Sequence, residues 1–397
     1  MIEKTSTSSA YYIDTFAQGS THEMVNSSLM IMCANVFEKV TCKVSRSSIQ
    51  AFNNVIDSDA PVNLNFDQIW VIRGESRASL VFRYVLSAFQ NIRYLFTSPK
   101  ESVIIFPFNN LFSLRAINFL NRLLKRRIII FCHSEMEGIT AELQGVGVLH
   151  KILAHLARNF FINPKVQLSD GIYFSVMGDI LKQNLSNSIS STKMERFINV
   201  DHPYIFKNAS THPKSKEDLL SIGTVGTLNK LKGLDTLRSL VKRFPPALRK
   251  EIRVSVTGRV SGDISGLQSL GIETVPENSA LSRAEFDRRV QGLDYILFFY
   301  PKNSYKITAS GAIYDAILHG RPILALKNDY FNYIFQKFGS FGFLLNNETE
   351  MSDKLKEIIH EREVLKVDFI SLRKKFTPDT LSAQLSNELI RIGYIAP

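Results

Sequence analysis

Two stretches in the second half of the chain carry residues suited to binding phosphate. The first follows the apolar segment LLSI and runs from Gly223 to Gly233, with Lys230 and Lys232 near its end. Glycine lets a backbone approach a ligand closely, and lysine neutralises phosphate charge. The stretch matches neither the GxxxxGK[ST] phosphate loop nor the GxGxxG dinucleotide fingerprint. It therefore favours an anion site, with an ordinary solvated loop as the alternative.

The second stretch runs from Pro301 to Asp315, directly after the apolar segment DYILFFY. Ser310 and Gly311 open an apolar helix, and Ser310 is the expected N-cap. The free N–H groups and the helix dipole favour an anion there by about 0.3–1 kcal/mol. Asp315 lies just over one turn further along, within reach of the ribose of a nucleotide whose phosphates lie at the helix start. The alternative is an ordinary capped helix with a solvated aspartate.

The first half of the chain offers side chains for acid–base chemistry. His133 directly follows the strand-like segment RIIIFC, with Glu135 and Glu137 beside it. The loop 19–23, which contains His22, follows another apolar segment, YYIDTF. Histidine and carboxylic acids are the usual proton donors and acceptors in catalysis. A structural role for each histidine is the alternative.

Metal-binding patterns are weak. Asp57-Ser58-Asp59 has the DxD form that can hold Mn²⁺ or Mg²⁺, but Ala-Pro follows it and a turn is the better interpretation. The three cysteines, Cys33, Cys42 and Cys132, include no CxxC pair. They indicate neither a disulfide framework nor a thiolate metal site, and they favour a reducing cytoplasm. We therefore expect no metal and no cofactor.

The elements that must position these residues alternate between strand and helix. A length of 397 residues suits two domains of about 150–200 residues each. A hydrophobic content of 45% and a charged content of 21% are globular values and exclude general disorder. Strand-like segments separated by helical ones predict an α/β fold with parallel sheets, in which ligands bind beyond the carboxyl ends of the strands. We expect domains at 1–205 and 206–377, and a terminal helix within 378–397 that packs back toward the first domain.

Together the two phosphate-type stretches resemble the nucleotide-binding half of the GT-B glycosyltransferases, of the group 1 or family 4-like type of bacterial polysaccharide synthesis. The family's VG…KG loop appears as Val225-Gly226 and Lys232-Gly233, and its GxxxEAxxxGxPV helix as GAIYDAILHGRPI from Gly311. The resemblance covers about residues 219–330 and the order of elements elsewhere. It implies two Rossmann-like, doubly wound domains that face a central cleft.

The resemblance also implies roles for particular residues. The lysine of KG binds the donor diphosphate, the acidic residue before alanine binds the ribose, and the helix start holds phosphate. The implied donor-binding residues are Gly226, Thr227, Lys230, Lys232, Arg259, Lys306, Thr308, Ser310, Gly311 and Asp315. The implied catalytic residues are His133, Glu135 and His22.

The sequence departs from the family pattern at two positions. Thr227 stands where the family has an arginine, so Lys230 or Arg259 must supply that charge. Ile307 stands where the family has an acidic residue, eight positions before the ribose ligand. The second departure leaves the stereochemistry of transfer unassigned.

The net charge of +11 suggests an anionic partner. Arg115, Arg122 and Lys125 fall on one side of the predicted helix 111–125, and Arg126 and Arg127 continue that side. Such a face can rest on anionic lipid through electrostatic attraction that salt weakens. No apolar run approaches the length of a membrane-spanning helix, and no basic stretch resembles a nucleic-acid-binding module.

These observations predict a cytoplasmic hexosyltransferase, with a possible peripheral position on the inner face of the cell membrane. Its donor would be a UDP- or GDP-sugar and its acceptor a glycan or lipid-linked saccharide. A sugar-nucleotide epimerase of the same fold and a non-catalytic α/β ligand-binding protein are the alternatives.

Overall fold

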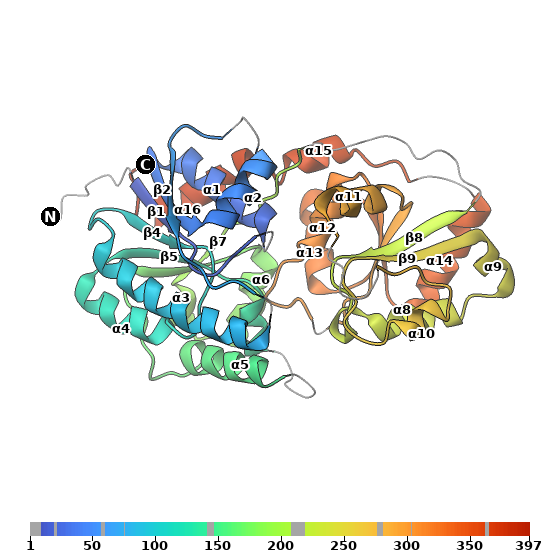
Figure 1. Cartoon of the computed structure of the whole chain (residues 1–397), viewed down its shortest axis with the longest axis horizontal. Coiled ribbons are helices and arrows are strands. Elements are labelled where there is room, and N and C mark those ends of the chain that lie inside the picture. Colours follow the sequence, from blue (N-terminus) through green and yellow to red (C-terminus); the bar gives the residue numbers. More distant parts are fainter. Residues whose placement is uncertain are drawn as a thin grey trace. The chain divides into compact units, whose positions relative to one another are not determined.

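The computed structural model describes residues 9–19, 22–56, 60–74, 76–140, 147–207, 219–275, 281–302, 304–361 and 365–397. These residues form two compact α/β units (Figure 1). Unit 1 comprises Met1–Lys207, Lys306–Ala309 and Phe376–Pro397, and unit 2 comprises Asn208–Tyr305 and Ser310–Lys375. The sequence predicts that the chain passes from the first domain to the second near residue 205 and returns to the first domain at the final helix. The structure adds the short segment Lys306–Ala309, which belongs to unit 1.

Unit 1 is built on a parallel sheet of seven strands in the order β3-β2-β1-β4-β5-β6-β7. The strands are β1 (Ser9–Ile13), β2 (Lys39–Ser45), β3 (Leu64–Ile69), β4 (Val103–Phe106), β5 (Arg127–Phe131), β6 (Ile172–Val176) and β7 (Phe197–Asn199). The helices are α1 (Glu23–Val36), α2 (Arg46–Ile56), α3 (Arg77–Thr97), α4 (Leu114–Leu124), α5 (Val148–Phe161), α6 (Asp179–Ser186), α7 (Ser191–Met194) and α16 (Pro378–Arg391), with a 3-10 turn at Ser134–Ile139.

Unit 2 is built on a parallel sheet of five strands in the order β12-β11-β10-β8-β9. The strands are β8 (Leu220–Val225), β9 (Ile252–Thr257), β10 (Tyr295–Phe298), β11 (Ile323–Leu326) and β12 (Gly342–Leu345). The helices are α8 (Leu234–Lys242), α9 (Pro246–Glu251), α10 (Ser265–Gln268), α11 (Arg283–Gln291), α12 (Ala312–Leu318), α13 (Asp329–Phe338), α14 (Glu348–Glu361) and α15 (Phe369–Lys374), with a 3-10 turn at Lys230–Lys232.

The central strands follow from the apolar runs in the sequence. All four residues of β4 and all four of β10 are buried, as expected for parallel strands covered on both faces. β2 is less obvious from sequence because Lys39, Thr41 and Lys43 interrupt its apolar pattern. The ammonium group of Lys43 pairs with Asp67 of β3 at 2.7 Å, which lets a lysine lie within the sheet.

The terminal helix α16 packs on α1 in unit 1. Asn35 donates to Asp379 at 2.9 Å, and the Gln384 amide donates to Asp201 at 2.9 Å. Beyond the helix, the Tyr394 hydroxyl donates to the carbonyl of Gly171 at 2.7 Å. Among the helices that the structure describes, none is long and apolar enough to cross a bilayer.

The structure corrects the basic face expected at residues 111–127. Arg126 is buried, and its guanidinium donates to the carbonyls of Leu95 (3.2 Å), Ser98 (2.9 Å) and Pro99. These carbonyls lie at the C-terminal end of α3, where a cation is favourable. Arg126 therefore holds α3 in place and presents no charge to a membrane.

We expect Arg126→Met to lower the free energy of unfolding by at least about 2 kcal/mol, because it leaves buried carbonyls without a donor. Arg122→Met is the matched control, since Arg122 is exposed and donates to one surface carbonyl, that of Gln167. Its effect should stay within about 0.5 kcal/mol. Urea unfolding of both variants measures the difference, and equal effects would contradict a structural role for Arg126.

Candidate active site

The turns after β8 and β9 meet through two glycines in unit 2. Gly226 has a φ of 78° and donates its N–H to the carbonyl of Thr257 at 2.9 Å. Gly258 has a φ of 143°, and a Cβ there would lie 2.1 Å from the Gly226 carbonyl oxygen. Gly258 therefore needs glycine, because a side chain would force these two turns apart, and Gly226 favours glycine because of its left-handed backbone.

Lys232 is held by the next turn of the same segment. The side chain of Asn229 accepts the N–H of Lys232 at 2.9 Å and so caps the 3-10 turn. Gly233 follows with a φ of 87°, and a Cβ there would lie 2.2 Å from the Cβ of Phe299. Burial lowers the pKa of Lys232 below its ordinary value. The ammonium group is thus partly removed from water, where its attraction for an anion is stronger.

A small cavity of about 10 Å³ adjoins Lys232 at the carboxyl ends of β8 and β10. It is lined by Thr224, Val225, Thr227, Leu228, Lys232, Leu297, Phe298, Phe299 and Tyr300. Thr227, Lys230 and Arg259 are exposed on the turns beside it. The structure therefore gathers Gly226, Thr227, Lys230, Lys232 and Arg259 in one region of unit 2.

Ser310 is not the helix cap that the sequence predicts. It is buried, and its hydroxyl shares a 3.0 Å hydrogen bond with the hydroxyl of Tyr300. Gly311 occupies the N-cap position of α12 and makes no side-chain cap. Tyr300 offers a partner from the end of β10, so the hydroxyl of Ser310 turns away from the helix N–H groups.

Asp315 lies in α12 and is paired with an arginine. Its Oδ1 accepts from Arg283 at 3.2 Å, and its side chain is 15% exposed. Arg283 also pairs with Asp287 at 2.9 Å, and Asp287 accepts from the ring of His319 at 2.9 Å. The alternative of a solvated aspartate is wrong, because this network fixes the carboxylate; the expected contact of Asp315 with a ribose stays a prediction.

Lys306 and Thr308 lie in the segment that belongs to unit 1, apart from Lys232. Glu137 accepts the N–H of Ile307 at 2.8 Å, and Asn184 donates to the carbonyl of Lys306 at 2.9 Å. Burial raises the pKa of Glu137 above its ordinary value, although the N–H of Ile307 opposes the shift. An acidic side chain therefore lies against Ile307, the position where the sequence lacks one.

In unit 1, His133 follows β5 and lies beside His22, with 5.4 Å between the ring centroids. Its Nε2 is 2.7 Å from the carbonyl oxygen of Pro107. Because a carbonyl only accepts, Nε2 carries the proton and Nδ1 is left as the acceptor. Removal from water and the neighbouring His22 lower the pKa of His133 to about 3, so its ring is neutral at physiological pH.

Glu135 is a buried carboxyl group two residues further along. Its Oε1 accepts the N–H of His133 at 2.9 Å, and its Oε2 has no hydrogen-bond partner among the described residues. Burial raises its pKa to about 7, against the opposing effect of the His133 N–H. A group that titrates near neutral pH can both donate and accept a proton.

His22 opens α1 in a left-handed conformation, with a φ of 57°. It is exposed, yet the protein around it lowers its pKa, so the neutral form is favoured. Left-handed backbone costs a non-glycine residue about 1–2 kcal/mol. Such strain is retained where it positions a functional group, and it makes His22 a stronger candidate than its loop position alone suggests.

Sequence reasoning missed a third histidine in this region. His202 is buried just after β7, and removal from water lowers its pKa to about 4. The charge of a protonated His22 contributes to the same lowering of the pKa. The apolar segment before His202 could have pointed to this residue as one that follows a strand. That strand, β7, is only three residues long, which makes it hard to predict from the sequence.

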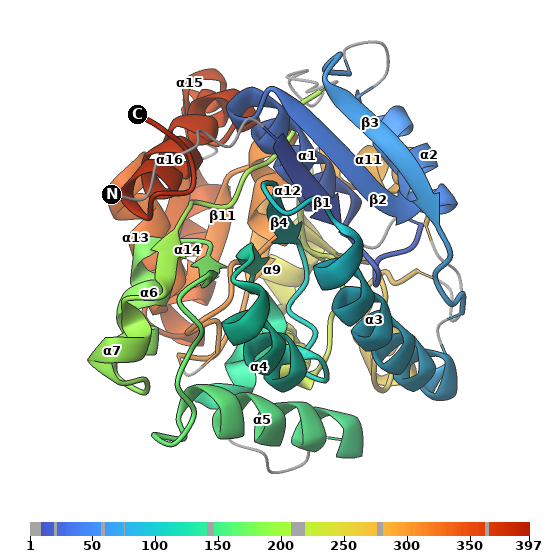
Figure 2. The same cartoon turned by 90° about the vertical axis from the view of Figure 1, so that its left-hand side faces the viewer.

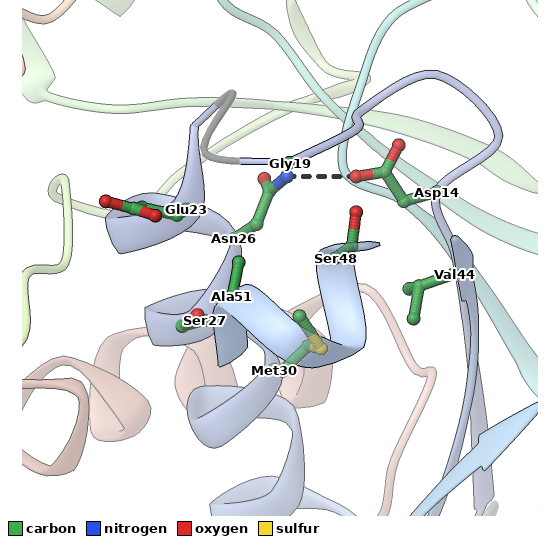
Figure 3. A pocket seen from close by; sticks show the side chains of 9 residues that line it. All are labelled: Asp14, Gly19, Glu23, Asn26, Ser27, Met30, Val44, Ser48 and Ala51. Carbon is green, nitrogen blue, oxygen red and sulfur yellow. Dashed lines mark hydrogen bonds between the residues drawn. The ribbon is translucent and has the colours of Figure 1, made fainter. Parts of the chain in front are cut away.

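Asp14 supports the loop that leads to His22. It is buried at the end of β1, and its carboxylate accepts from the N–H groups of Phe16 (3.0 Å) and Ala17 (2.8 Å) and from Asn26 (2.9 Å). Burial raises its pKa. Figure 3 shows the cavity beside Asp14, which measures about 10 Å³ and holds one water at most. The site is therefore structural.

Within the described parts of the chain, no group of three or more His, Cys, Asp or Glu residues is arranged to hold a metal ion. Asp57-Ser58-Asp59 lies outside the described residues, as do Ser20 and Thr21 of the loop 19–23. The structure therefore does not test the expectation that the DxD pattern is a turn.

No protein-family model matches the sequence, and no curated protein matches it. Solved structures do match. WaaG, a glycosyltransferase involved in lipopolysaccharide biosynthesis, is 14% identical with a TM-score of 0.56, over 96% of this chain and 99% of that one. Anabaena HepE in complex with UDP-glucose is 10% identical with a TM-score of 0.60, over 96% and 99%. The lipopolysaccharide outer core galactosyltransferase WaaB is 14% identical with a TM-score of 0.57, over 96% and 99%.

At these identities the likeness concerns the fold, and it agrees with the two parallel sheets and the glycine turns described above. It also confirms the resemblance read from Val225-Gly226, Lys232-Gly233 and the helix that follows Gly311. This chain has the GT-B fold, which it shares with the glycosyltransferases WaaG, HepE and WaaB.

Proposed function

We propose that this protein is a hexosyltransferase that moves a sugar from a UDP- or GDP-sugar to a saccharide or lipid-linked acceptor in bacterial surface polysaccharide synthesis. The observation that carries the proposal is Lys232, which a capped turn and two closely packed glycine positions hold beside the end of β8. The neighbours named above support the substrate class, since HepE is described with UDP-glucose and WaaG with lipopolysaccharide biosynthesis.

In this proposal, the donor diphosphate lies against Lys232, with Lys230 and Arg259 supplying further positive charge. Gly226, Thr227 and Gly311 present backbone to it, and Asp315 binds the ribose. Arg283 holds Asp315 in one orientation through their ion pair. Because charge develops on the leaving diphosphate, fixed cations are the groups that such a reaction needs in the absence of a metal.

The acid–base roles follow from the three side chains of unit 1. A ring with a pKa of about 3 is a poor base at neutral pH, so His133 orients its neighbours instead. His22 is exposed and neutral, and we propose that it acts as the general base that takes the proton from the acceptor hydroxyl. Glu135 titrates near pH 7 and accepts the backbone N–H of His133. We therefore expect the loss of the Glu135 proton to affect the backbone conformation at His133.

We further propose that the enzyme needs no metal and no cofactor, and that it works in the cytoplasm at the inner face of the cell membrane. An assay with a panel of sugar nucleotides and saccharide acceptors tests the whole proposal. Transfer predicts free UDP or GDP that depends on acceptor and persists in EDTA. An isomeric sugar nucleotide would indicate an epimerase, and no change would indicate a binding protein. Loss of transfer in EDTA, restored by Mn²⁺, would contradict metal independence.

Lys232→Ala should raise the dissociation constant of UDP or GDP by at least tenfold, or about 1.4 kcal/mol, because it removes the fixed cation beside the diphosphate. Lys242→Ala is the control, since Lys242 lies at the far end of α8. Isothermal titration with the nucleotide, and with inorganic pyrophosphate, measures both. Unchanged affinity in Lys232→Ala would refute the placement of the diphosphate.

Glu135→Gln should raise stability at alkaline pH. The carboxyl pKa is about 7 in the folded protein against 4.5 ordinarily, so the folded state holds the proton longer than the unfolded chain. Wild-type stability should therefore fall as the pH rises from 4.5 to 7, by up to about 3 kcal/mol, and Glu135→Gln should remove that fall.

Urea unfolding from pH 4.5 to 8 measures this difference, with Glu38→Gln as an exposed control in the same unit. The proposed role also requires Glu135→Gln to lose transfer activity while it gains stability. If the free energy of unfolding of Glu135→Gln varied with pH as that of wild type does, burial would not raise the pKa of Glu135 and the prediction would be wrong.

A further inference from the structure

The outward face of α3 is apolar. Val81, Phe82, Val85, Phe89 and Phe96 are each between 38% and 67% exposed. Their spacing places all five within one sector of the helix. Single exposed apolar residues are common on soluble proteins, but a contiguous row of this kind indicates a binding surface for another protein or a membrane.

The inward face of the same helix carries polar side chains beside the apolar residues Tyr84, Ala88 and Leu95. Ser87 shares a 2.6 Å hydrogen bond with Thr15, and Asn91 accepts from Thr15 at 2.8 Å. Asn110 donates to Ser87 at 3.0 Å, and Arg83 donates to the carbonyl of Ile72 at 2.9 Å. Rotating α3 to bury its phenylalanines would break these buried bonds, so the apolar face is fixed outward.

Helix α4 and the end of β3 extend this surface. α4 packs beside α3 and exposes Phe119 (64%) and Leu123 (75%), and Figure 2 shows the two helices together on one side of unit 1. Trp70 is 68% exposed, and its carbonyl accepts from Gln90 of α3 at 2.9 Å. We call Trp70, Val81, Phe82, Val85, Phe89, Phe96, Phe119 and Leu123 the α3–α4 face.

The charge around the α3–α4 face has one sign. Helices α3 and α4 contain five arginines and no aspartate or glutamate. Arg77, Arg93, Arg115 and Arg122 are exposed. Apolar aromatic side chains among arginines fit the boundary between lipid headgroups and acyl chains of an anionic bilayer. A second copy of this chain would oppose arginine to arginine and fits poorly.

We propose that the α3–α4 face docks this protein on an anionic lipid bilayer, with Phe82 and Phe89 inserted at the headgroup boundary. This refines the membrane position proposed above, and it does not depend on sugar transfer. It also replaces the electrostatic attachment expected from α4 alone, because Arg126 is buried and Arg115 and Arg122 each donate to a carbonyl of the protein. Attachment by apolar insertion should resist salt.

The test uses the full chain with vesicles of phosphatidylglycerol and phosphatidylcholine, and with phosphatidylcholine alone. Wild type should sediment with the anionic vesicles and remain bound at about 0.5 M NaCl, where electrostatic attraction is strongly screened. Trp70 is the one tryptophan of the sequence, so its emission reports on this surface and should shift to shorter wavelength on binding.

Phe82→Ser/Phe89→Ser should weaken binding at least about tenfold. Val62→Ser/Ile370→Ser, at two exposed apolar positions elsewhere, should bind as wild type does. Circular dichroism and nucleotide affinity should be unchanged in both, which separates a failure of docking from a failure of the donor site.

Four results would overturn the proposal. The first is a failure of wild type to bind anionic vesicles, and the second is a phenylalanine variant that binds as well as wild type. Complete release by salt would show attachment through arginine charge and not through insertion. A lipid-free dimer that Phe82→Ser/Phe89→Ser dissociates would instead make the face an interface between copies of this chain.

Discussion

Close backbone contact between neighbouring strand ends is the constraint on which the candidate donor site depends. Gly258 lies against the carbonyl of Gly226, and Gly233 lies against Phe299, with no space for a Cβ at either position. These contacts bring the turns after β8, β9 and β10 together. The positions of Lys232 and the cavity beside it follow from that packing, because the turn that carries Lys232 ends at Gly233.

Burial controls the chemistry of unit 1 in a different way. It makes the ring of His133 neutral and holds the proton on Glu135 up to about pH 7. A glutamate in this environment lowers stability at alkaline pH, and a glutamine would fill the same volume without that cost. Glu135 bonds to the N–H of His133, and the ring of His133 lies beside the strained His22. A destabilising ionisable group in such a cluster is the pattern on which the proposed catalytic roles rest.

Local chemistry was predictable from the sequence, and long-range partners were not. The turn from Gly226 to Gly233 could be recognised because its glycines and lysines act within a few residues of one another. Ser310 could not, because its partner is the hydroxyl of Tyr300. Arg126 resembles its exposed neighbours in sequence, yet the carbonyls at the end of α3 surround it.

The same limit applies to Ile307 and to the sheet. The sequence shows an isoleucine where a carboxylate is expected, while the fold brings Glu137 onto its N–H from a segment 170 positions away. β2 and β7 are hard to recognise in the sequence, because lysines interrupt the first and the second is three residues long. In contrast, the alternation of apolar strands and helices was sufficient for the fold class, since a parallel sheet needs long buried runs.

Helix α3 shows where the usual interpretation of an apolar pattern fails. Its periodicity correctly indicates a helix, and the normal inference places the apolar side in the core. Here Ser87 and Asn91 face inward beside Tyr84 and Leu95 and bind Thr15, so polar groups share the core side of the helix with apolar ones. Hydrogen bonds contribute little net stability compared with buried phenylalanine, so this arrangement costs stability in water. In the docking that we propose, a bilayer covers the outward face and offsets that cost, so the same arrangement of α3 that is unfavourable in water suits the helix to a lipid surface.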